Sequence, residues 1–165
     1  MIMGGSQGSA IINKTLRDAL PNLLGEFNAC HICGKGNLGD VQNGYRQFEY
    51  VRDDLPHLFA MTDVFVGRSG ATTLFELLAL KKPGLLIPLG TGASRGDQIL
   101  NAQSFARQGF SEVLMQDDLT PATLTGGIKK VFANRRLMVA AMEQCRVPNG
   151  ISAVIGVIRG VVGEG

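Results

Sequence analysis

The sequence has little of the chemistry on which hydrolytic, metal-dependent or disulfide-rich proteins depend. It contains two histidines, His31 and His57, and three cysteines among 165 residues. Neither histidine lies in a position expected for a catalytic triad, and no cluster of His, Asp and Glu residues suggests a metal site. Three cysteines are an odd number without regular spacing, which argues against a disulfide framework.

Long apolar runs and an excess of one charge are also missing. No run approaches the roughly 18 residues that a membrane-spanning helix needs, and no signal peptide is evident, so we expect no membrane span. The formal net charge is +2 without a run of Lys and Arg, so we expect no nucleic-acid partner. Cys30 and Cys33 form a C-x-x-C inside a strand-like run rather than at a helix start. We interpret them as buried, reduced thiols of a cytoplasmic protein.

Apolar residues, by contrast, are plentiful and regularly arranged. Hydrophobic residues make up 45% of the chain and charged residues 18%, so one domain, or one lobe of a larger enzyme, can build a sizeable core. Strand patterns occupy residues 1–3, 27–33, 48–51, 63–66, 84–88 and 112–115, and helical patterns occupy 11–23, 53–61, 74–80, 97–108, 120–133, 135–144 and 150–162. This alternation predicts an α/β fold, a Rossmann-like open parallel sheet with helices on both faces, and residues 1–165 read as one domain.

The stretch GRSGATTLFE at residues 67–76 is the most informative part of the chain. It follows a buried strand and leads into a helix, so backbone N–H groups of the turn lack intrahelical partners. The helix dipole favours an anion there, and Gly70 and Ala71 allow a ligand to approach the backbone. Glu76, one turn later, is placed to accept hydrogen bonds from vicinal hydroxyls. A diphosphate on the amides and a ribose on the acid would together form a nucleotide site, whereas the alternative is an ordinary strand-to-helix turn.

Two other glycine motifs have competing interpretations. GGSQG at residues 4–8 matches the G-x-S-x-G of a hydrolase nucleophile, but no histidine and no oxyanion segment accompany it. We therefore favour contacts from Ser6 and the turn amides to a phosphate or sugar. GKGNLG at residues 34–39 matches the G-x-G-x-x-G of dinucleotide sites, but the stretch after it is a poor helix. We interpret it as a solvent-exposed loop.

A third polar turn, SRGDQILN at residues 94–101, opens a helix. Asp97 and Gln98 lie in its first turn, and a Gln that can donate and accept beside an Asp that accepts suits sugar hydroxyls. The alternative is that Asp97 only complements the helix dipole. The turns at 4–9, 67–71 and 89–97 should all fall at the carboxyl ends of the strands, where such folds bind ligands.

Together, residues 4–9, 67–76 and 94–101 resemble the donor-binding half of the MurG family of cell-wall glycosyltransferases over roughly residues 1–162. The resemblance implies one lobe of a two-lobed GT-B fold that holds UDP-N-acetylglucosamine, with no cofactor and no metal. It implies a diphosphate contact by Ser6, a backbone contact from Val51 to uracil, a ribose contact by Glu76 and a sugar contact by Gln98. Asp97 departs from the family pattern, in which a second Gln precedes that Gln. The full set of expected donor contacts is Ser6, Gln7, Gly8, Val51, Arg68, Ser69, Gly70, Ala71, Thr72, Thr73, Leu74, Glu76, Asp97 and Gln98.

The resemblance also indicates what this stretch of chain lacks. In the family, an N-terminal lobe carries the acceptor loop, the membrane-docking patch and the expected catalytic base. The first strand pattern covers only residues 1–3, which suggests that an upstream portion is missing. We therefore expect the donor half of an inverting transferase that converts lipid I to lipid II, peripheral on the cytoplasmic face of the membrane as a full-length enzyme and inactive as this part alone. Alternatives are a non-catalytic nucleotide-sugar-binding subunit of a split enzyme, or a glycolipid synthase of the same fold.

Overall fold

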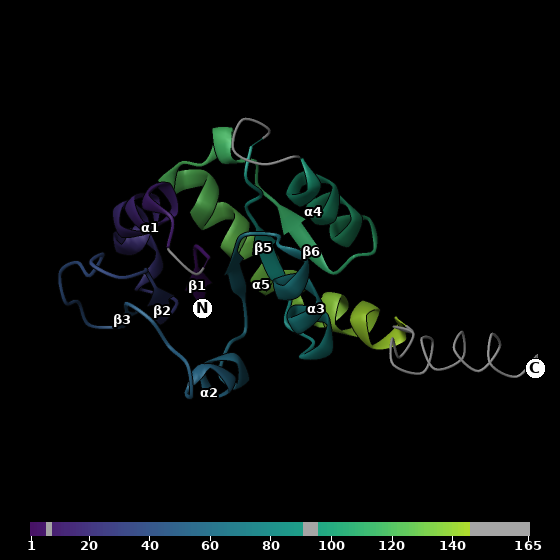
Figure 1. Cartoon of the computed structure of the whole chain (residues 1–165), viewed down its shortest axis with the longest axis horizontal. Coiled ribbons are helices and arrows are strands. Elements are labelled where there is room, and N and C mark those ends of the chain that lie inside the picture. Colours follow the sequence, from purple (N-terminus) through teal and green to yellow (C-terminus); the bar gives the residue numbers. More distant parts are fainter. Residues whose placement is uncertain (6–7, 91–95, 146–165) are drawn as a thin grey trace, which may run out of the picture.

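The protein is a single parallel sheet covered by helices on both faces, as the sequence predicts (Figure 1). The computed structural model describes residues 1–5, 8–90 and 96–145. The strands, in the spatial order β3-β2-β1-β4-β5-β6, are β1 (Ile2–Met3), β2 (Ala29–Ile32), β3 (Tyr45–Phe48), β4 (Phe65–Gly67), β5 (Gly84–Leu86) and β6 (Ser111–Val113). The helices are α1 (Ala10–Leu23), α2 (Leu55–Ala60), α3 (Ala71–Ala79), α4 (Asp97–Arg107), the 3-10 turn η1 (Gln116–Asp118) and α5 (Pro121–Gln144). This is the strand order of the Rossmann fold, which reverses direction between β1 and β4.

Side chains of the central strands alternate between two separate apolar clusters. Val66 and Leu85 pack with α1 and α5 on one face of the sheet. Phe65 and Leu86 pack with α2, α3 and α4 on the other face. Because successive residues of a strand point to opposite faces, a strand buried on both sides reads as a continuous apolar run, and β4 and β5 show this pattern.

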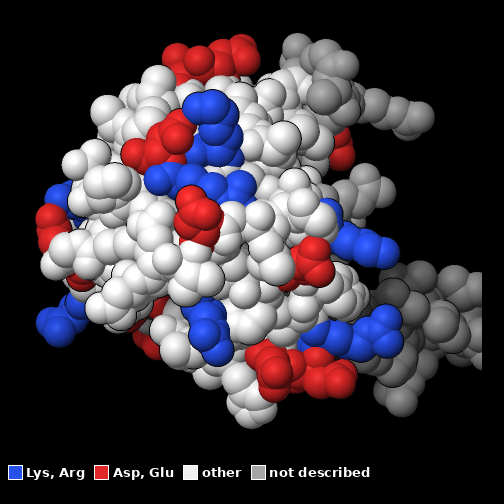
Figure 2. All heavy atoms as spheres, turned by 90° about the vertical axis from the view of Figure 1, so that its left-hand side faces the viewer, with Lys and Arg blue, Asp and Glu red and all other residues white. Residues whose placement is uncertain are grey.

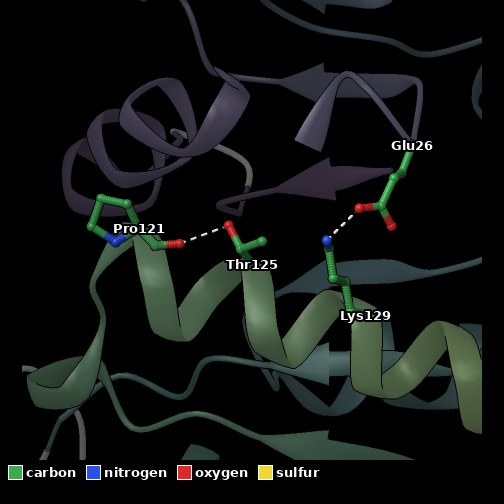
Figure 3. A network of polar contacts seen from close by, with 4 residues as sticks. All are labelled: Glu26, Pro121, Thr125 and Lys129. Carbon is green, nitrogen blue, oxygen red and sulfur yellow. Dashed lines mark hydrogen bonds and ion pairs between the residues drawn. The ribbon is translucent and has the colours of Figure 1, made fainter. Parts of the chain in front are cut away.

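The long helix α5 is anchored at its start and along its length. Thr120 caps it, because its hydroxyl accepts a hydrogen bond from the Thr123 N–H at 3.2 Å, and Pro121 occupies the first turn as the sequence predicts. Figure 3 shows the Thr125 hydroxyl donating to the Pro121 carbonyl at 2.7 Å and Lys129 paired with Glu26, which lies in the turn before β2. The first two contacts lie within α5 and its cap, and the ion pair joins α5 to the turn before β2.

Two local expectations from the sequence were wrong. The third strand is Tyr45–Phe48 rather than residues 48–51, because β3 pairs with β2 from Ala29↔Tyr45 and buries the Tyr45 side chain. The two helices expected at 120–133 and 135–144 are one continuous helix, since no Gly or Pro interrupts it between them and buried Met138 extends its apolar face. The helix expected at 150–162 lies outside the described residues.

The described surface carries mixed charge. On the face shown in Figure 2, basic and acidic side chains are interspersed among uncharged ones, without a continuous field of one sign. Among the residues that the structure describes, no helix is both long enough and apolar enough to cross a membrane. Over the same residues, no group of three His, Cys, Asp or Glu side chains could hold a metal ion.

Candidate functional site

The candidate site lies where the strand order reverses, at the carboxyl ends of β1 and β4. These strands pair in parallel, with Met3 opposite Gly67, so the turns that follow them emerge side by side. Ligands of open α/β sheets bind at this position because the loops on either side diverge and leave a crevice. Two of the three turns identified from the sequence, 4–9 and 67–71, are thus neighbours.

The turn after β1 depends on glycine for steric reasons. Gly5 and Gly8 have φ values of +104° and +80°, and the Gly8 N–H donates to the Gly5 carbonyl at 3.0 Å. A Cβ on Gly8 would lie 2.2 Å from the carbonyl oxygen of Cys33. A side chain at Gly8 would therefore separate this turn from the end of β2. Ser6 and Gln7, two of the expected donor contacts, lie outside the described residues.

The start of α3 presents unpaired backbone donors. Gly70 is its N-cap residue, with no side-chain cap and no acidic residue in the first turn. Leu74 is the first residue whose N–H bonds within the helix, to Gly70 at 3.0 Å, so the amides of residues 71–73 have no acceptor in the described part of the chain. Apart from its two chain neighbours, no described residue has an atom within 4 Å of a Cβ built on Gly70, so the space beside this residue is open among the described residues. An anion could approach these amides and the positive end of the helix dipole.

Glu76 lies one turn into α3 and is exposed. Its carboxylate forms no ion pair or hydrogen bond with other described residues, so both oxygens can accept bonds from a ligand. Ala71 and Thr72 are exposed on the first turn and Thr73 is half-buried. Leu74, also an expected contact, is 4% exposed, and its side chain packs in the apolar cluster beneath α3. Its side chain therefore supports the helix from the core side.

The Arg68 guanidinium joins the segments that form the candidate site. Its Nη1 donates to the carbonyls of Ile87 at 3.0 Å and Pro88 at 3.3 Å. Its Nη2 donates to Ser9 Oγ at 3.0 Å and Gln116 Oε1 at 2.7 Å. Four of its five N–H groups thus bind the protein, and desolvation lowers the pKa of the half-buried guanidinium. The sequence predicted Arg68 as a donor contact, but the geometry assigns it to joining the turn after β4 to three other segments.

Ser69 and the first turn of α4 form a second tie. Ser69 is fully buried, and its hydroxyl donates to the backbone carbonyl of Gln98 at 2.7 Å. The Asn101 amide donates to the Ser69 carbonyl at 3.3 Å. The side chain of Gln98 accepts from the Leu89 N–H at 3.2 Å, which turns its Nε2 donors away from that loop. The third predicted turn is therefore joined to the second, although Ser69 itself serves the framework.

The remaining predicted residues lie at the same edge with less definite contacts. Asp97 is exposed in the first turn of α4, next to Gly96, whose φ is +82°. Val51 follows β3 in the loop before α2 and packs partly against the cluster of α2, α3 and α4. The contributions of Ser9, Leu89 and Gln116 were missed from the sequence, because only the helix-cap position of Ser9 gives any local signal.

The alternative motifs have structural explanations. His31 is fully buried, and its two ring nitrogens lie 2.7 Å from the Tyr45 hydroxyl and 2.9 Å from Asn13 Oδ1. This side chain is thus committed to the core and unavailable to a triad. No helix lies between β2 and β3, so residues 34–39 form a loop rather than a dinucleotide turn. Cys30 and Cys33 are free thiols whose pKa values burial raises, although Cys30 is only half-buried.

A cavity of about 620 Å³ lies away from this edge. Met1, Ala29 and Val64 line it at the amino ends of the strands. It contains none of the predicted site residues, whereas the unpaired amides and Glu76 lie at the opposite edge.

The comparisons with known proteins agree with this geometry. The model of the glycosyltransferase family 28 C-terminal domain matches residues 1–152. An enzyme of Clostridium novyi, named UDP-N-acetylglucosamine–N-acetylmuramyl-(pentapeptide) pyrophosphoryl-undecaprenol N-acetylglucosamine transferase, is 50% identical over 162 residues. An enzyme of the same name from Geobacillus kaustophilus is 48% identical. Each alignment covers 96% of this chain and 45% of the relative, so the chain spans about half the length of these proteins.

A solved structure shows the same architecture. The crystal structure of Acinetobacter baumannii MurG superposes with a TM-score of 0.79 at 25% identity, over 96% of this chain and 48% of that one. The matched family model covers most of the chain, and the six-stranded parallel sheet agrees with the solved relative. The chain therefore belongs to glycosyltransferase family 28 and forms its C-terminal domain.

Proposed function

We propose that this chain is the donor lobe of an inverting N-acetylglucosaminyltransferase that converts lipid I to lipid II in peptidoglycan synthesis. The observation that carries the proposal is the pair of features at the start of α3. Among the described residues, the amides of residues 71–73 have no acceptor, and the carboxylate of Glu76, one turn further along, has no partner. The printed names of relatives at 48–50% identity support the same donor sugar.

In this proposal the nucleotide lies across the carboxyl ends of β1 and β4. The diphosphate contacts the amides of residues 71–73 and the turn that contains Gly8. Glu76 accepts hydrogen bonds from the two ribose hydroxyls, and Val51 contacts the base through its backbone. Gln98, held by Leu89, directs its Nε2 donors to the sugar hydroxyls. Asp97 is exposed beside it and supplies a further acceptor.

The chemistry assigned to this lobe is stabilisation of the leaving group. An acceptor hydroxyl forms a bond to the anomeric carbon, and the bond from that carbon to the β-phosphate oxygen breaks. Negative charge then grows on UDP, and amides at a helix N-terminus stabilise it more in the transition state than in the ground state. We assign the acceptance of the hydroxyl proton to a base outside this chain, since His31 is buried and bonded to Tyr45 and Asn13.

The acceptor lipid and the membrane surface are assigned to the remainder of the longer protein. This chain spans 45% of the length of its relatives, and we assign the acceptor site and the catalytic base to the other part of a protein of that length. The whole enzyme would then act at the cytoplasmic face of the membrane. The alternative is a nucleotide-sugar-binding subunit that does not transfer sugar by itself.

Calorimetry tests the donor assignment directly. UDP-N-acetylglucosamine is titrated into the chain and compared with UDP-glucose, UDP-galactose and UDP. We expect UDP-N-acetylglucosamine to bind more tightly than the other two UDP-sugars, because Gln98 and Asp97 are assigned to hydrogen bonds with the sugar. Equal affinity for all three sugars would contradict the assigned donor, and no binding of UDP would contradict a nucleotide site.

A further inference from the structure

The loop at residues 34–39 has no role in the proposed site, yet it adjoins that site. It follows β2, which pairs with β1 on the side opposite β4. The turn after β1 is therefore flanked by this loop on one side and by the start of α3 on the other. A group held above that turn, such as a diphosphate, lies between the loop and the unpaired amides.

The loop touches the glycine turn closely. A Cβ on Gly8 would lie 3.2 Å from the Cα atom of Gly34. Because consecutive Cα atoms are about 3.8 Å apart, the Cα atom of Lys35 lies at most about 7 Å from that point. The four-carbon stem of a lysine extends across such a distance, so its ammonium can reach the space above the turn.

Neighbouring elements hold the loop in place. The Arg17 guanidinium on α1 donates to the carbonyl of Asn37. The side-chain amide of Gln47 on β3 accepts from the Gly39 N–H at 2.9 Å and donates to the Gly39 carbonyl at 3.1 Å. The Gly36 N–H donates to Glu49 Oε1 at 2.5 Å. The backbone on both sides of Lys35 is thus fixed before any ligand binds, which lowers the entropy cost of using its side chain.

The charge of Lys35 is not neutralised by a neighbour. Lys35 is exposed and forms no ion pair with any described carboxylate, including Glu49, which follows β3 and accepts from the Gly36 N–H. Lys14, Lys129 and Lys130, in contrast, each pair with an acid. Arg68 on the far side of the turn is already bound to four protein acceptors. The diphosphate would otherwise meet only the partial charges of backbone amides.

We propose that Lys35 binds the diphosphate of the nucleotide from the side of β2, opposite the start of α3. This inference rests on the proposed function, because it takes a nucleoside diphosphate as the ligand. A charged hydrogen bond at this point balances the growing charge of the leaving group in the transfer step. It also gives the glycine-rich loop, which lacks the helix of a dinucleotide site, a role in the same site.

The test compares ligands with and without phosphate. UDP and uridine are titrated into wild-type chain, Lys35→Met, Lys35→Arg and Lys130→Met, the last being a control that removes the same charge from α5. We expect Lys35→Met to bind UDP about 10-fold more weakly and uridine unchanged. Lys35→Arg should retain most of the affinity, and Lys130→Met should match wild type. The affinity for UDP should also depend less on salt in Lys35→Met than in wild type.

The outcomes separate this inference from the function on which it rests. If wild-type chain does not bind UDP, the proposed function fails. If wild-type chain binds UDP and Lys35→Met binds it equally well, the role of Lys35 is refuted and the function stands. If Lys35→Met loses UDP and uridine to the same extent, the residue supports the loop, and its contact to the diphosphate is refuted. Thermal melting of each variant confirms that it is folded.

Discussion

At the scale of single residues, the polar side chains of the candidate site are of two kinds: those that hydrogen-bond to the protein and those that remain available to a ligand. Glu76 has an exposed carboxylate with no partner among the described residues, whereas Arg68 and Ser69 direct their polar atoms to protein acceptors. A polar side chain that already has its hydrogen bonds positions the backbone, and one that lacks them is available to a ligand. This distinction separates the proposed nucleotide contacts from the residues that support them.

Replacement of Glu76 with alanine should weaken UDP binding by about 1.5–3 kcal/mol, the range for hydrogen bonds that involve a charged group. The loss follows from removal of the acceptor that we assign to the ribose hydroxyls. Calorimetric titration of UDP into both proteins measures it. Glu143→Ala, which removes an exposed carboxylate from the last turn of α5, should bind UDP like wild type. Equal dissociation constants for Glu76→Ala and wild type would contradict the ribose assignment.

The buried His31 makes stability depend on pH. The Asn13 amide donates to the Cys33 carbonyl at 2.8 Å, so its oxygen accepts from His31 Nε2–H, and Nδ1 accepts from Tyr45. Both ring positions are thus satisfied in the neutral form, and burial lowers the pKa of His31 from 6.5 to about 4. In the unfolded chain His31 is protonated below about pH 6.5, whereas in the folded chain it is protonated only below about pH 4. Stability from this residue is therefore present above pH 6.5 and lost as the pH falls toward 4.

We expect the free energy of unfolding to fall by up to about 3 kcal/mol from this cause between pH 7.5 and pH 4.5. Urea unfolding at a series of pH values measures the effect. His31→Gln, which cannot titrate, should be less stable than wild type at neutral pH but should lose less stability on acidification. His57→Gln makes the same replacement at an exposed position and is measured alongside it. An unchanged slope in His31→Gln would exclude the buried histidine as the cause.

At the scale of elements, the two glycine-containing turns have different requirements. Gly8 has φ of +80° and contacts the end of β2, so glycine is needed there for folding. Gly70 has φ of −64° and no neighbouring atom within 4 Å of a Cβ, so the fold does not require glycine there. Open space above a helix start is what an approaching phosphate needs.

Gly8→Ala and Gly70→Ala form a matched pair for this difference. Gly8→Ala should lower the free energy of unfolding by about 1–3 kcal/mol, because a Cβ there meets backbone at 2.2 Å and the dihedral angle is strained. Gly70→Ala should leave unfolding nearly unchanged and weaken UDP binding. Chemical denaturation and UDP titration of both variants measure these effects. A destabilised Gly70→Ala with normal UDP affinity would contradict the assignment of this helix start to a ligand.

At the scale of the whole molecule, all described site turns lie along one edge of one sheet. Such an edge can hold a nucleotide and present its sugar, but transfer also needs a base near the acceptor and a second wall that excludes water. The relatives are about twice as long as this chain, which agrees with a second lobe that supplies both.

The chain alone should therefore bind the donor and transfer no sugar. The assay uses labelled UDP-N-acetylglucosamine and a short-chain lipid I analogue, with this chain, with a separately produced N-terminal lobe of a relative, and with both. We expect turnover only in the mixture. Turnover by this chain alone would contradict the division of labour between lobes. Donor binding without turnover in the mixture would favour the non-catalytic subunit.

Local sequence determined the elements and the candidate turns of this protein. Continuous apolar runs and apolar stripes of helical period identified five of the six strands and the helices that follow the site turns, because these patterns reflect which faces are buried. The Gly70 turn and Glu76 could be proposed as a site from the sequence, because the motif of an anion-binding helix start is short and contiguous. Where the local pattern was ambiguous, as at Phe48 and Ala133, the boundaries were misplaced.

Only the tertiary structure decided which of these residues bind the framework and which remain free. The bond from Arg68 to Gln116 joins residues 48 apart, and the bond from Ser69 to Gln98 joins residues 29 apart. No local period encodes such contacts, because they arise when parallel strands with long connections bring distant turns to one edge. The same strand order places Gly34, the residue before Lys35, beside Gly8. The sequence by itself thus showed which residues make up each turn, whereas the hydrogen-bond partners of their side chains depend on how the distant segments pack together.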